Sequence, residues 1–295
     1  MNFNKLQSVG IKIKTMFILF FITLNITTAN AARILILGDS LSVPDGYGFG
    51  RELEKQLKAQ GHAVCTTASC GASPSSFVST IYKTQCGFYQ SSLSGPPISI
   101  SYSNFKIDKT PPHLTPKLDK IFDNDVKPEL TVIQQGTNMY GFIFENSAKT
   151  AASLISNQVK KMLEKLQTYS PQSKCLWIGP PQIAKYDAKV VSESQKQMMA
   201  DAIREGIQSS GVKCEFLDSR EVTPMPVGDG THFSSILQTS KWIAAAQKEA
   251  LLLLVPLASE VETNRDQSIN CKSKIEIFDK SKVKKIEKVL EKFNH

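Results

Sequence analysis

The sequence predicts an α/β fold, a three-layer α/β/α domain around a five-stranded parallel sheet. Apolar runs such as Ile34–Leu37 do not alternate with polar residues, which is typical of strands buried on both faces. These runs alternate along the chain with segments of helical character, as in sheets whose parallel strands are joined by helices. The length also fits, because the roughly 260 residues after residue 31 suffice for one such domain with an appendage.

The first part of the predicted domain contains two strands and one helix. The strand over 33–37 leads into a glycine-containing loop, and the helix over 51–60 ends at Gly61, a residue that commonly terminates helices. A short strand over 63–67 then precedes a loop of small residues, 69–76.

The stretch from Cys86 to Pro116 is rich in Ser, Pro, Gly and Tyr and lacks helical periodicity. A loop of this length in a compact domain usually has a function, so we expect it to cover a site as a lid. A helical segment begins over 118–122, and the third strand follows over 129–134.

The last part continues the alternation. A helix over 147–169 has apolar residues at helical spacing and is followed by the fourth strand over 175–179. A further helix over 192–209, the fifth strand over 212–217 and a last helix over 234–254 complete the predicted domain, residues 32–255.

The first 31 residues have the features of a secretory signal peptide. Lysines at positions 5, 12 and 14 form a positive n-region, Met16–Ile26 is an apolar core, and Ala29–Ala31 is an A-x-A cleavage site. The apolar run is short for a membrane-spanning helix, although an uncleaved anchor is the alternative. We therefore expect export to the periplasm or the extracellular space.

The charge left after removal of this segment is modestly positive, with 32 basic and 27 acidic residues. Such a balance suits contact with an anionic envelope surface, and it is equally ordinary surface chemistry. We expect no nucleic-acid partner. Residues 256–295 form a polar, basic extension, and the lysine-rich segment 280–293 has its apolar residues on one helical face. We expect this helix to fold back on the domain, the alternative being a membrane or partner contact.

Six cysteines follow residue 31, and an even number in an exported chain favours disulfides over buried free thiols. Cys70 and Cys86 bracket one loop, so we predict that they pair. Cys175 and Cys214 open two successive strands, and parallel neighbours about 4.8 Å apart would allow a second bridge.

The remaining cysteines, Cys65 and Cys271, form a third pair by subtraction only. The chain has no C-x-x-C spacing and no cysteine–histidine cluster of the kind that holds a metal. We accordingly expect no metal site and no cofactor.

A Gly-Asp-Ser corner at residues 38–40 comes directly after the first strand. It places Ser40 at the carboxyl end of that strand, the edge of an open α/β sheet where ligands bind. A serine hydroxyl is a poor nucleophile until a base removes its proton. Ser40 is therefore a candidate nucleophile if the chain supplies a base.

The best candidate base is His232, because among the four histidines it alone has a carboxylate at fixed short range. Asp229, three residues earlier on a turn, is positioned to accept a hydrogen bond from the imidazole Nδ1–H. This leaves Nε2 for Ser40, as in a Ser-His-Asp triad. The alternative is a structural histidine.

Ester hydrolysis places negative charge on the carbonyl oxygen, which needs hydrogen-bond donors. The candidates are the backbone N–H groups of Ser40 and Gly71 and the side-chain amide of Asn138. Asn138 follows the third strand in a Gly-Thr-Asn motif and reaches the same sheet edge as Ser40, although asparagine is also common in turns.

The motifs at residues 38–40, 136–138 and 229–232, in this order, resemble those of the SGNH or GDSL hydrolase family. The resemblance covers roughly residues 33–250. The second block departs from the family pattern, which has an asparagine and more than one glycine, whereas residues 67–73 contain a single glycine. The chain has no Gly-x-Ser-x-Gly elbow, which argues against the α/β-hydrolase alternative.

The resemblance implies a role for each matching residue. Ser40 matches the nucleophile of the family, and Asp229 and His232 match its acid and base. Gly71 and Asn138 match the residues that complete its oxyanion hole.

Four aromatic residues of the segment between Cys86 and Pro116 are candidate substrate contacts: Phe88, Tyr89, Tyr102 and Phe105. Aromatic faces offer large contact areas to sugar rings or acyl chains. The alternative is that these side chains anchor the loop to the domain.

The function expected from these residues is that of an exported serine esterase that removes acetyl or short acyl groups from a carbohydrate, such as a cell-envelope polysaccharide, or from a small ester. The same triad would also serve a lipase, a thioesterase or an acyltransferase. A non-catalytic glycan-binding module is the alternative of a different class.

Overall fold

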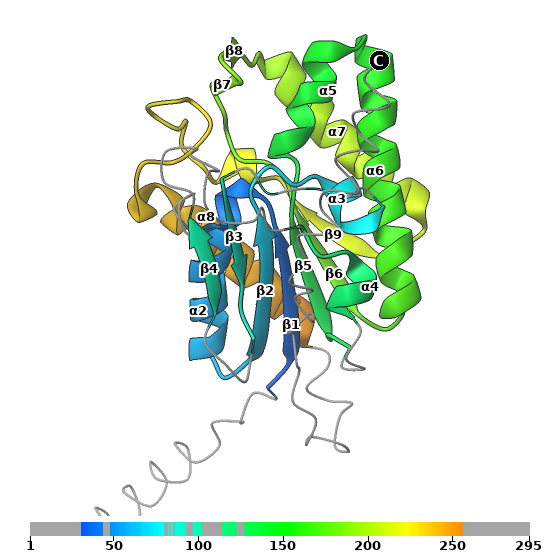
Figure 1. Ribbon diagram of the computed structural model, residues 1–295, viewed down its shortest axis with the longest axis vertical. Coiled ribbons are helices and arrows are strands. Elements are labelled where there is room, and N and C mark those ends of the chain that lie inside the picture. Colours follow the sequence, from blue (N-terminus) through cyan, green and yellow to red (C-terminus); the bar gives the residue numbers. More distant parts are fainter. Residues whose placement is uncertain are drawn as a thin grey trace, which may run out of the picture. The chain divides into compact units, whose positions relative to one another are not determined.

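Figure 1 shows the computed structural model of the 295-residue chain. The structure describes residues 31–43, 48–79, 82, 84, 86–92, 97–101, 114–122 and 127–255. The chain divides into two compact units, residues 1–31 and 32–295, and every described strand and helix belongs to the second. Residues 1–30 of the predicted signal peptide and the whole predicted C-terminal extension, 256–295, lie outside the described residues.

The second unit has a seven-stranded sheet of order β4-β3-β2-β1-β5-β6-β9. Five neighbouring strands are parallel, as expected: β2 (Ala63–Ser69), β1 (Arg33–Gly38), β5 (Leu130–Gln134), β6 (Lys174–Ile178) and β9 (Cys214–Leu217). Parallel pairing brings all five carboxyl ends to one edge of the sheet.

The sheet is wider than predicted because two antiparallel strands extend it beyond β2. They are β3 (Gly87–Gln90) and β4 (Ile98–Ser101), and both lie in the segment that we expected to be a loop. Each has only four residues, too few to show a period. Their pairing depends on the free side of β2, where Ser69 lies opposite Phe88.

The helices match the expected ones and add two more. They are α2 (Phe49–Ala59), α3 (Pro74–Val78), α4 (Leu118–Ile121), α5 (Tyr140–Glu145), α6 (Ala148–Tyr169), α7 (Glu193–Ser210) and α8 (Ile236–Leu254). Helix α3 begins within the expected small-residue loop, where Ser73 and Ser76 form a capping box before the first turn. Helix α5 was not expected, since it spans only six residues. None of the described helices combines the length and apolarity needed to cross a membrane.

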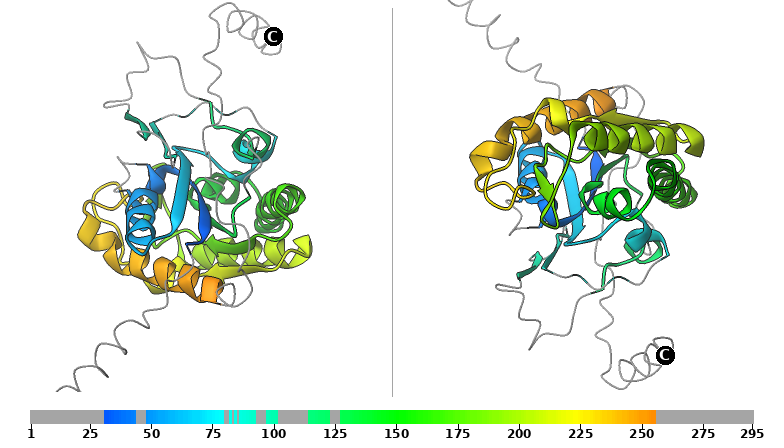
Figure 2. Two further views of the ribbon diagram at one scale, coloured as in Figure 1. Left: turned by 90° about the horizontal axis from the view of Figure 1, so that it is seen from below. Right: turned by 90° about the horizontal axis from the view of Figure 1, so that it is seen from above.

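Helices cover both faces of the sheet (Figure 2), and one hydrophobic cluster lies on each face. Ile34 and Ile36 of β1 pack in the cluster that includes α2 and α8, whereas Leu35 and Leu37 pack in the cluster that includes α6 and α7. This explains why the strand has no polar alternation, because both of its faces are buried. Helices α2 and α8 also touch each other, with the rings of Phe49 and Trp242 stacked 3.9 Å apart.

A small hairpin follows β6 on the carboxyl side of the sheet (Figure 1). It consists of β7 (Lys185–Tyr186) and β8 (Lys189–Val190). The two turn residues, Asp187 and Ala188, have positive φ angles of 48° and 62°. A turn of this shape usually contains glycine, so residues 187 and 188 do not predict it.

Both predicted disulfides are formed in the structure. The Cα atoms of Cys70 and Cys86 are 5.4 Å apart, and those of Cys175 and Cys214 are 4.4 Å apart. The second pair joins residues that lie directly opposite each other in β6 and β9, as expected for neighbouring parallel strands. Cys65 is also disulfide-bonded, and Cys271 lies outside the described residues.

Removal of the bridge between β6 and β9 is predicted to destabilise the fold. The Cys175→Ala/Cys214→Ala variant frees a loop of 39 residues, which should lower the free energy of unfolding by about 3–4 kcal/mol. Urea denaturation measures this loss. The bridge between Cys70 and Cys86 spans 16 residues, so its removal should have a smaller effect. Peptide mapping that finds these thiols unlinked would contradict the prediction.

Candidate active site

The turn that carries Ser40 is held against strand β5. A 3₁₀ turn, η1 (Ser40–Ser42), follows β1 directly. The Ser42 hydroxyl donates to Gln134 Oε1 at 2.7 Å, and the backbone N–H of Asp39 donates to the same oxygen at 3.4 Å. A Cβ at Gly38 would overlap the Ser42 side chain, so the tight corner requires glycine there.

Ser40 is 5 % exposed, and its hydroxyl has no hydrogen-bond partner among the described residues. The hydroxyl oxygen is nevertheless not fully buried. It is therefore reachable from solvent and free to react or to bind a ligand.

The neighbouring Asp39 is fully buried. Burial raises the pKa of its carboxyl group to about 6, although a hydrogen bond from the Leu41 N–H, contact with Gln134 and attraction to His232 partly oppose the rise. The Leu41 N–H lies 3.0 Å from Asp39 Oδ1, so the carboxylate caps η1. The other carboxylate oxygen is buried without a hydrogen-bond partner within the described part of the chain.

The first candidate oxyanion residue after Ser40 is Gly71, which follows β2. It has a φ of +79°, a conformation that L side chains rarely adopt. A Cβ at this position would also overlap the hydroxyl of Tyr82. Glycine is thus required both by the backbone and by the close approach of a tyrosine.

The second candidate oxyanion residue after Ser40 is Asn138, on the 3₁₀ turn η4 (Thr137–Met139) after β5. Its Nδ2 donates to the carbonyl oxygen of Ala72 at 2.9 Å, which joins this turn to the loop that contains Gly71. The amide nitrogen carries a second hydrogen that remains available. The structure therefore brings two of the predicted oxyanion residues together at the carboxyl edge of the sheet.

His232 and Asp229 form the expected pair, with Nδ1 and Oδ2 2.7 Å apart. The other Asp229 oxygen accepts the backbone N–H groups of Thr231 and His232, each at 2.8 Å. Burial alone would raise the pKa of Asp229, but these hydrogen bonds outweigh it and hold the pKa below its ordinary value. The carboxylate stays ionised, fixes the imidazole and leaves Nε2 free.

Ser40 and His232 are not hydrogen-bonded to each other in this structure. Their loops are linked electrostatically, since His232 attracts the carboxylate of Asp39, the residue before Ser40. Catalytic hydrogen bonds in ligand-free proteins are often long and tighten when substrate binds. A free serine hydroxyl, an oriented imidazole and convergent amide donors are the groups that acyl transfer requires.

Phe88 and Tyr89, two of the candidate substrate contacts, are buried. They are 3 % and 5 % exposed in β3, and the Tyr89 hydroxyl donates to Glu54 Oε2 at 3.2 Å. Their burial favours the alternative interpretation, in which these side chains anchor the segment to the domain. Tyr102 and Phe105 lie outside the described residues.

Two other tyrosines lie beside the candidate oxyanion residues. Tyr82 approaches Gly71, and the Tyr186 hydroxyl donates to the carbonyl oxygen of Asn138 at 3.4 Å. Neither residue belongs to a motif. Tyr186 depends on the unexpected β7–β8 hairpin, so only the structure identifies it.

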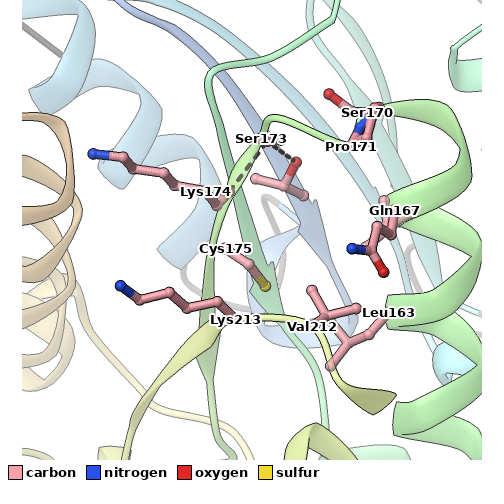
Figure 3. Close-up of a pocket in the computed structure, with 11 residues that line it drawn as sticks. Leu163, Gln167, Ser170, Pro171, Ser173, Lys174, Cys175, Val212 and Lys213 are labelled. Carbon is pink, nitrogen blue, oxygen red and sulfur yellow. Dashed lines mark hydrogen bonds between the residues drawn. The ribbon is translucent and has the colours of Figure 1, made fainter.

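A cavity of about 130 Å³ lies at the opposite edge of the sheet, beside the amino end of β6 (Figure 3). Its lining includes Ser170, Lys174, Cys175 and Val212. The Lys174 ammonium group donates to the carbonyl oxygen of Leu253 at 2.6 Å. The cavity is thus separate from the Ser40 edge, and none of the predicted catalytic residues lines it.

Within the described ranges, no group of three His, Cys, Asp or Glu side chains is arranged to hold a metal.

The buried Asp39 predicts an unusual pH dependence of stability. The unfolded chain releases this proton near pH 3.8, whereas the folded chain holds it up to about pH 6. Stability should therefore fall as the pH rises from about 4 to about 6, by at most about 3 kcal/mol. Asp39→Asn retains a capping oxygen but cannot ionise.

Melting temperatures of the wild type and Asp39→Asn between pH 4 and 7 test this prediction. The variant should lack the fall, and Asp201→Asn, at an exposed aspartate on α7, should keep it. Parallel profiles for the wild type and Asp39→Asn would show that Asp39 is not the group responsible.

Among known proteins, only solved structures of low sequence identity are similar to this chain. No family model matches the chain, and no curated protein matches it. A solved carbohydrate esterase family 2 enzyme from Corynascus thermopiles (Myceliophthora fergusii), with its carbohydrate-binding domain, is 16% identical; the match covers 78% of this chain and 67% of that one, with a TM-score of 0.46.

Two further solved structures are an aryl esterase from M. smegmatis and an acetyl xylan esterase from the rumen bacterium Butyrivibrio proteoclasticus. The aryl esterase is 20% identical over 75% of this chain and all of that one, with a TM-score of 0.44. The xylan esterase is 12% identical over 77% of this chain and 64% of that one, also with a TM-score of 0.44. Identities of 20% or less and TM-scores below 0.5 assign this chain neither an activity nor a substrate.

Proposed function

We propose that this chain is a serine ester hydrolase of the SGNH or GDSL type. The observation that carries the proposal is the 2.7 Å contact between His232 Nδ1 and Asp229 Oδ2, which orients a base. Ser40, with a hydroxyl that has no partner among the described residues, supplies the nucleophile. Gly71 and Asn138 come from two loops joined by a hydrogen bond.

The proposed reaction uses these groups in two steps. Ser40 Oγ attacks the ester carbonyl carbon while His232 Nε2 takes the hydroxyl proton and Asp229 stabilises the resulting imidazolium. The N–H groups of Ser40 and Gly71 and the Asn138 amide bind the oxyanion. The intermediate then expels the alcohol, which takes the proton from His232 and leaves Ser40 acylated.

In the second step, His232 removes a proton from water, which attacks the acyl-enzyme. The second tetrahedral intermediate collapses, Ser40 leaves and recovers its proton from His232, and the carboxylic acid is released. Every proton that the imidazole accepts is thus returned within one turnover.

We infer that the substrate is an acetyl or short acyl ester of a carbohydrate. The proposed signal peptide over residues 1–31 and the two described disulfides support an exported enzyme that meets such polymers. The family that the chain resembles often acts on acetylated sugars. A lipase-like or thioesterase-like substrate is the alternative on the same catalytic groups.

Hydrolysis is favoured over acyl transfer by the exposure of the candidate base. The side chains of His232 and Asp229 are 36 % and 57 % exposed, so water has access to the imidazole. A transferase must shield its acyl-enzyme from water. A non-catalytic glycan-binding module would have no need for an aspartate that fixes the orientation of an exposed histidine.

Ser40→Ala tests the proposed function. Loss of the nucleophile should abolish hydrolysis of nitrophenyl acetate and of O-acetylated glycans, as well as labelling by a serine-directed fluorophosphonate. Thermal stability should change little, since the Ser40 hydroxyl makes no hydrogen bond within the described part of the chain. Ser240→Ala, at an exposed serine of α8, is the control that should retain activity. Covalent label on another serine would contradict the assignment.

Asn138→Ala should lower kcat about 10²-fold and change KM little, because the amide is needed most when the oxyanion forms. Steady-state kinetics on nitrophenyl acetate measures both constants. The hydrogen bond to Ala72 is lost as well, so circular dichroism must show that the variant is folded. A change confined to KM would instead assign Asn138 to substrate binding.

A further inference from the structure

The β7–β8 hairpin is attached to the loop that carries Asp229 and His232. The backbone N–H groups of Ala184 and Lys185 donate to the carbonyl oxygen of Gly230 at 2.7 and 3.1 Å. In the opposite direction, the Thr231 hydroxyl donates to the carbonyl oxygen of Lys185 at 2.5 Å. These three bonds fix the start of the hairpin beside the candidate base.

The same hairpin carries Tyr186 across to the Asn138 turn. Its ring lies 6.5 Å from that of Phe144, nearly parallel to it, and 6.1 Å from that of Tyr140, both on α5. Gly141 of α5 also lies beside the phenol, since a Cβ there would be in van der Waals contact with it, 3.9 Å from the hydroxyl oxygen. With its ring held in this way, the hydroxyl lies 3.4 Å from the Asn138 carbonyl oxygen.

A second phenol, that of Tyr82, approaches from the β2 side of the site. Its hydroxyl lies so close to Gly71 that any side chain there would overlap it. The two phenols flank neighbouring loops, because Tyr82 lies against Gly71, Asn138 donates to Ala72 beside it, and Tyr186 donates to Asn138. Burial raises the pKa of Tyr82, and Tyr186 adds to the rise. The Tyr82 hydroxyl makes no hydrogen bond within the described residues, and the Tyr186 hydroxyl makes a single long one.

We propose that Tyr82 and Tyr186 form a binding subsite for the hydroxyl groups of a carbohydrate, the alcohol part of the ester. The inference rests on the proposed esterase function and names the residues that recognise its substrate. An acetyl group has one polar atom, its carbonyl oxygen, and in the proposed mechanism that atom occupies the oxyanion hole. Partners for the two phenols must therefore come from the alcohol.

The chemistry of the two phenols matches that of a sugar. A phenol hydroxyl both donates and accepts, as each sugar hydroxyl does. An ester whose alcohol part has no further hydroxyl group would displace water from both phenols and offer them no new hydrogen bond, which disfavours it. The subsite thus discriminates by the presence of hydroxyl groups rather than by size.

The test compares two acetate esters of primary alcohols with similar ring size, 6-O-acetylglucose and cyclohexylmethyl acetate, of which only the first has free hydroxyls. In Tyr82→Phe and Tyr186→Phe, the ratio of kcat/KM for the sugar ester to that for the cyclohexyl ester should fall about fivefold each, mainly through KM. The matched control is Tyr169→Phe, at a tyrosine on α6 that stacks on Phe122 away from the site and should keep the wild-type ratio.

An unchanged ratio in both variants, or an equal loss on both esters, would overturn the subsite. A second measurement does not depend on turnover: saturation-transfer NMR of 6-O-acetylglucose with Ser40→Ala, alone and combined with each tyrosine variant. Weaker binding in the combined variants supports the subsite even if the wild type proves to hydrolyse no ester, which would refute the proposed function alone. Absence of sugar binding to Ser40→Ala, or binding that the tyrosine changes leave unaltered, refutes the subsite.

Discussion

The position of Ser40 depends on one side chain, Gln134, at the end of the neighbouring strand β5. Its Oε1 accepts the Ser42 hydroxyl at 2.7 Å and the Asp39 N–H at 3.4 Å, so the corner after β1 is held from the side. Gly38 permits the close return of the chain, because a Cβ there would overlap Ser42. The corner is held by the hydroxyl of Ser42, whereas the hydroxyl of Ser40 makes no hydrogen bond to the described residues.

The other half of the site has a different support. Asp229 and His232 belong to a loop whose backbone is hydrogen-bonded to the β7–β8 hairpin through Gly230, rather than to a strand of the main sheet. Tyr186 of the hairpin reaches the Asn138 turn, and Asn138 in turn donates to Ala72 after β2. A chain of contacts through the hairpin thus links the candidate base to the loops that carry the two candidate oxyanion residues, Gly71 and Asn138.

Much of this site could be predicted from the sequence because its groups lie within short motifs. The Asp229–His232 pair is set by a three-residue spacing, and the Cys175–Cys214 bridge follows from two neighbouring strands. The tyrosines could not be predicted, since their place depends on contacts between distant segments. Tyr89 was also misplaced by sequence reasoning, which assigned it to a loop. It is a buried residue of β3, because β3 pairs with the free edge of β2, a contact between segments that a four-residue strand does not reveal.

Asp39 shows that the stability of the corner and the electrostatics of the site are coupled through one carboxyl group. Burial raises its pKa to about 6, so ionisation at neutral pH opposes folding. The same ionised carboxylate attracts His232, and this interaction is reciprocal. Asp229 contacts the imidazole of His232 directly, at 2.7 Å, whereas Asp39 interacts with it only through space. A neutral residue at position 39 would relieve the fold of a buried charge and remove the attraction to His232, so a gain in stability at neutral pH is expected at this position.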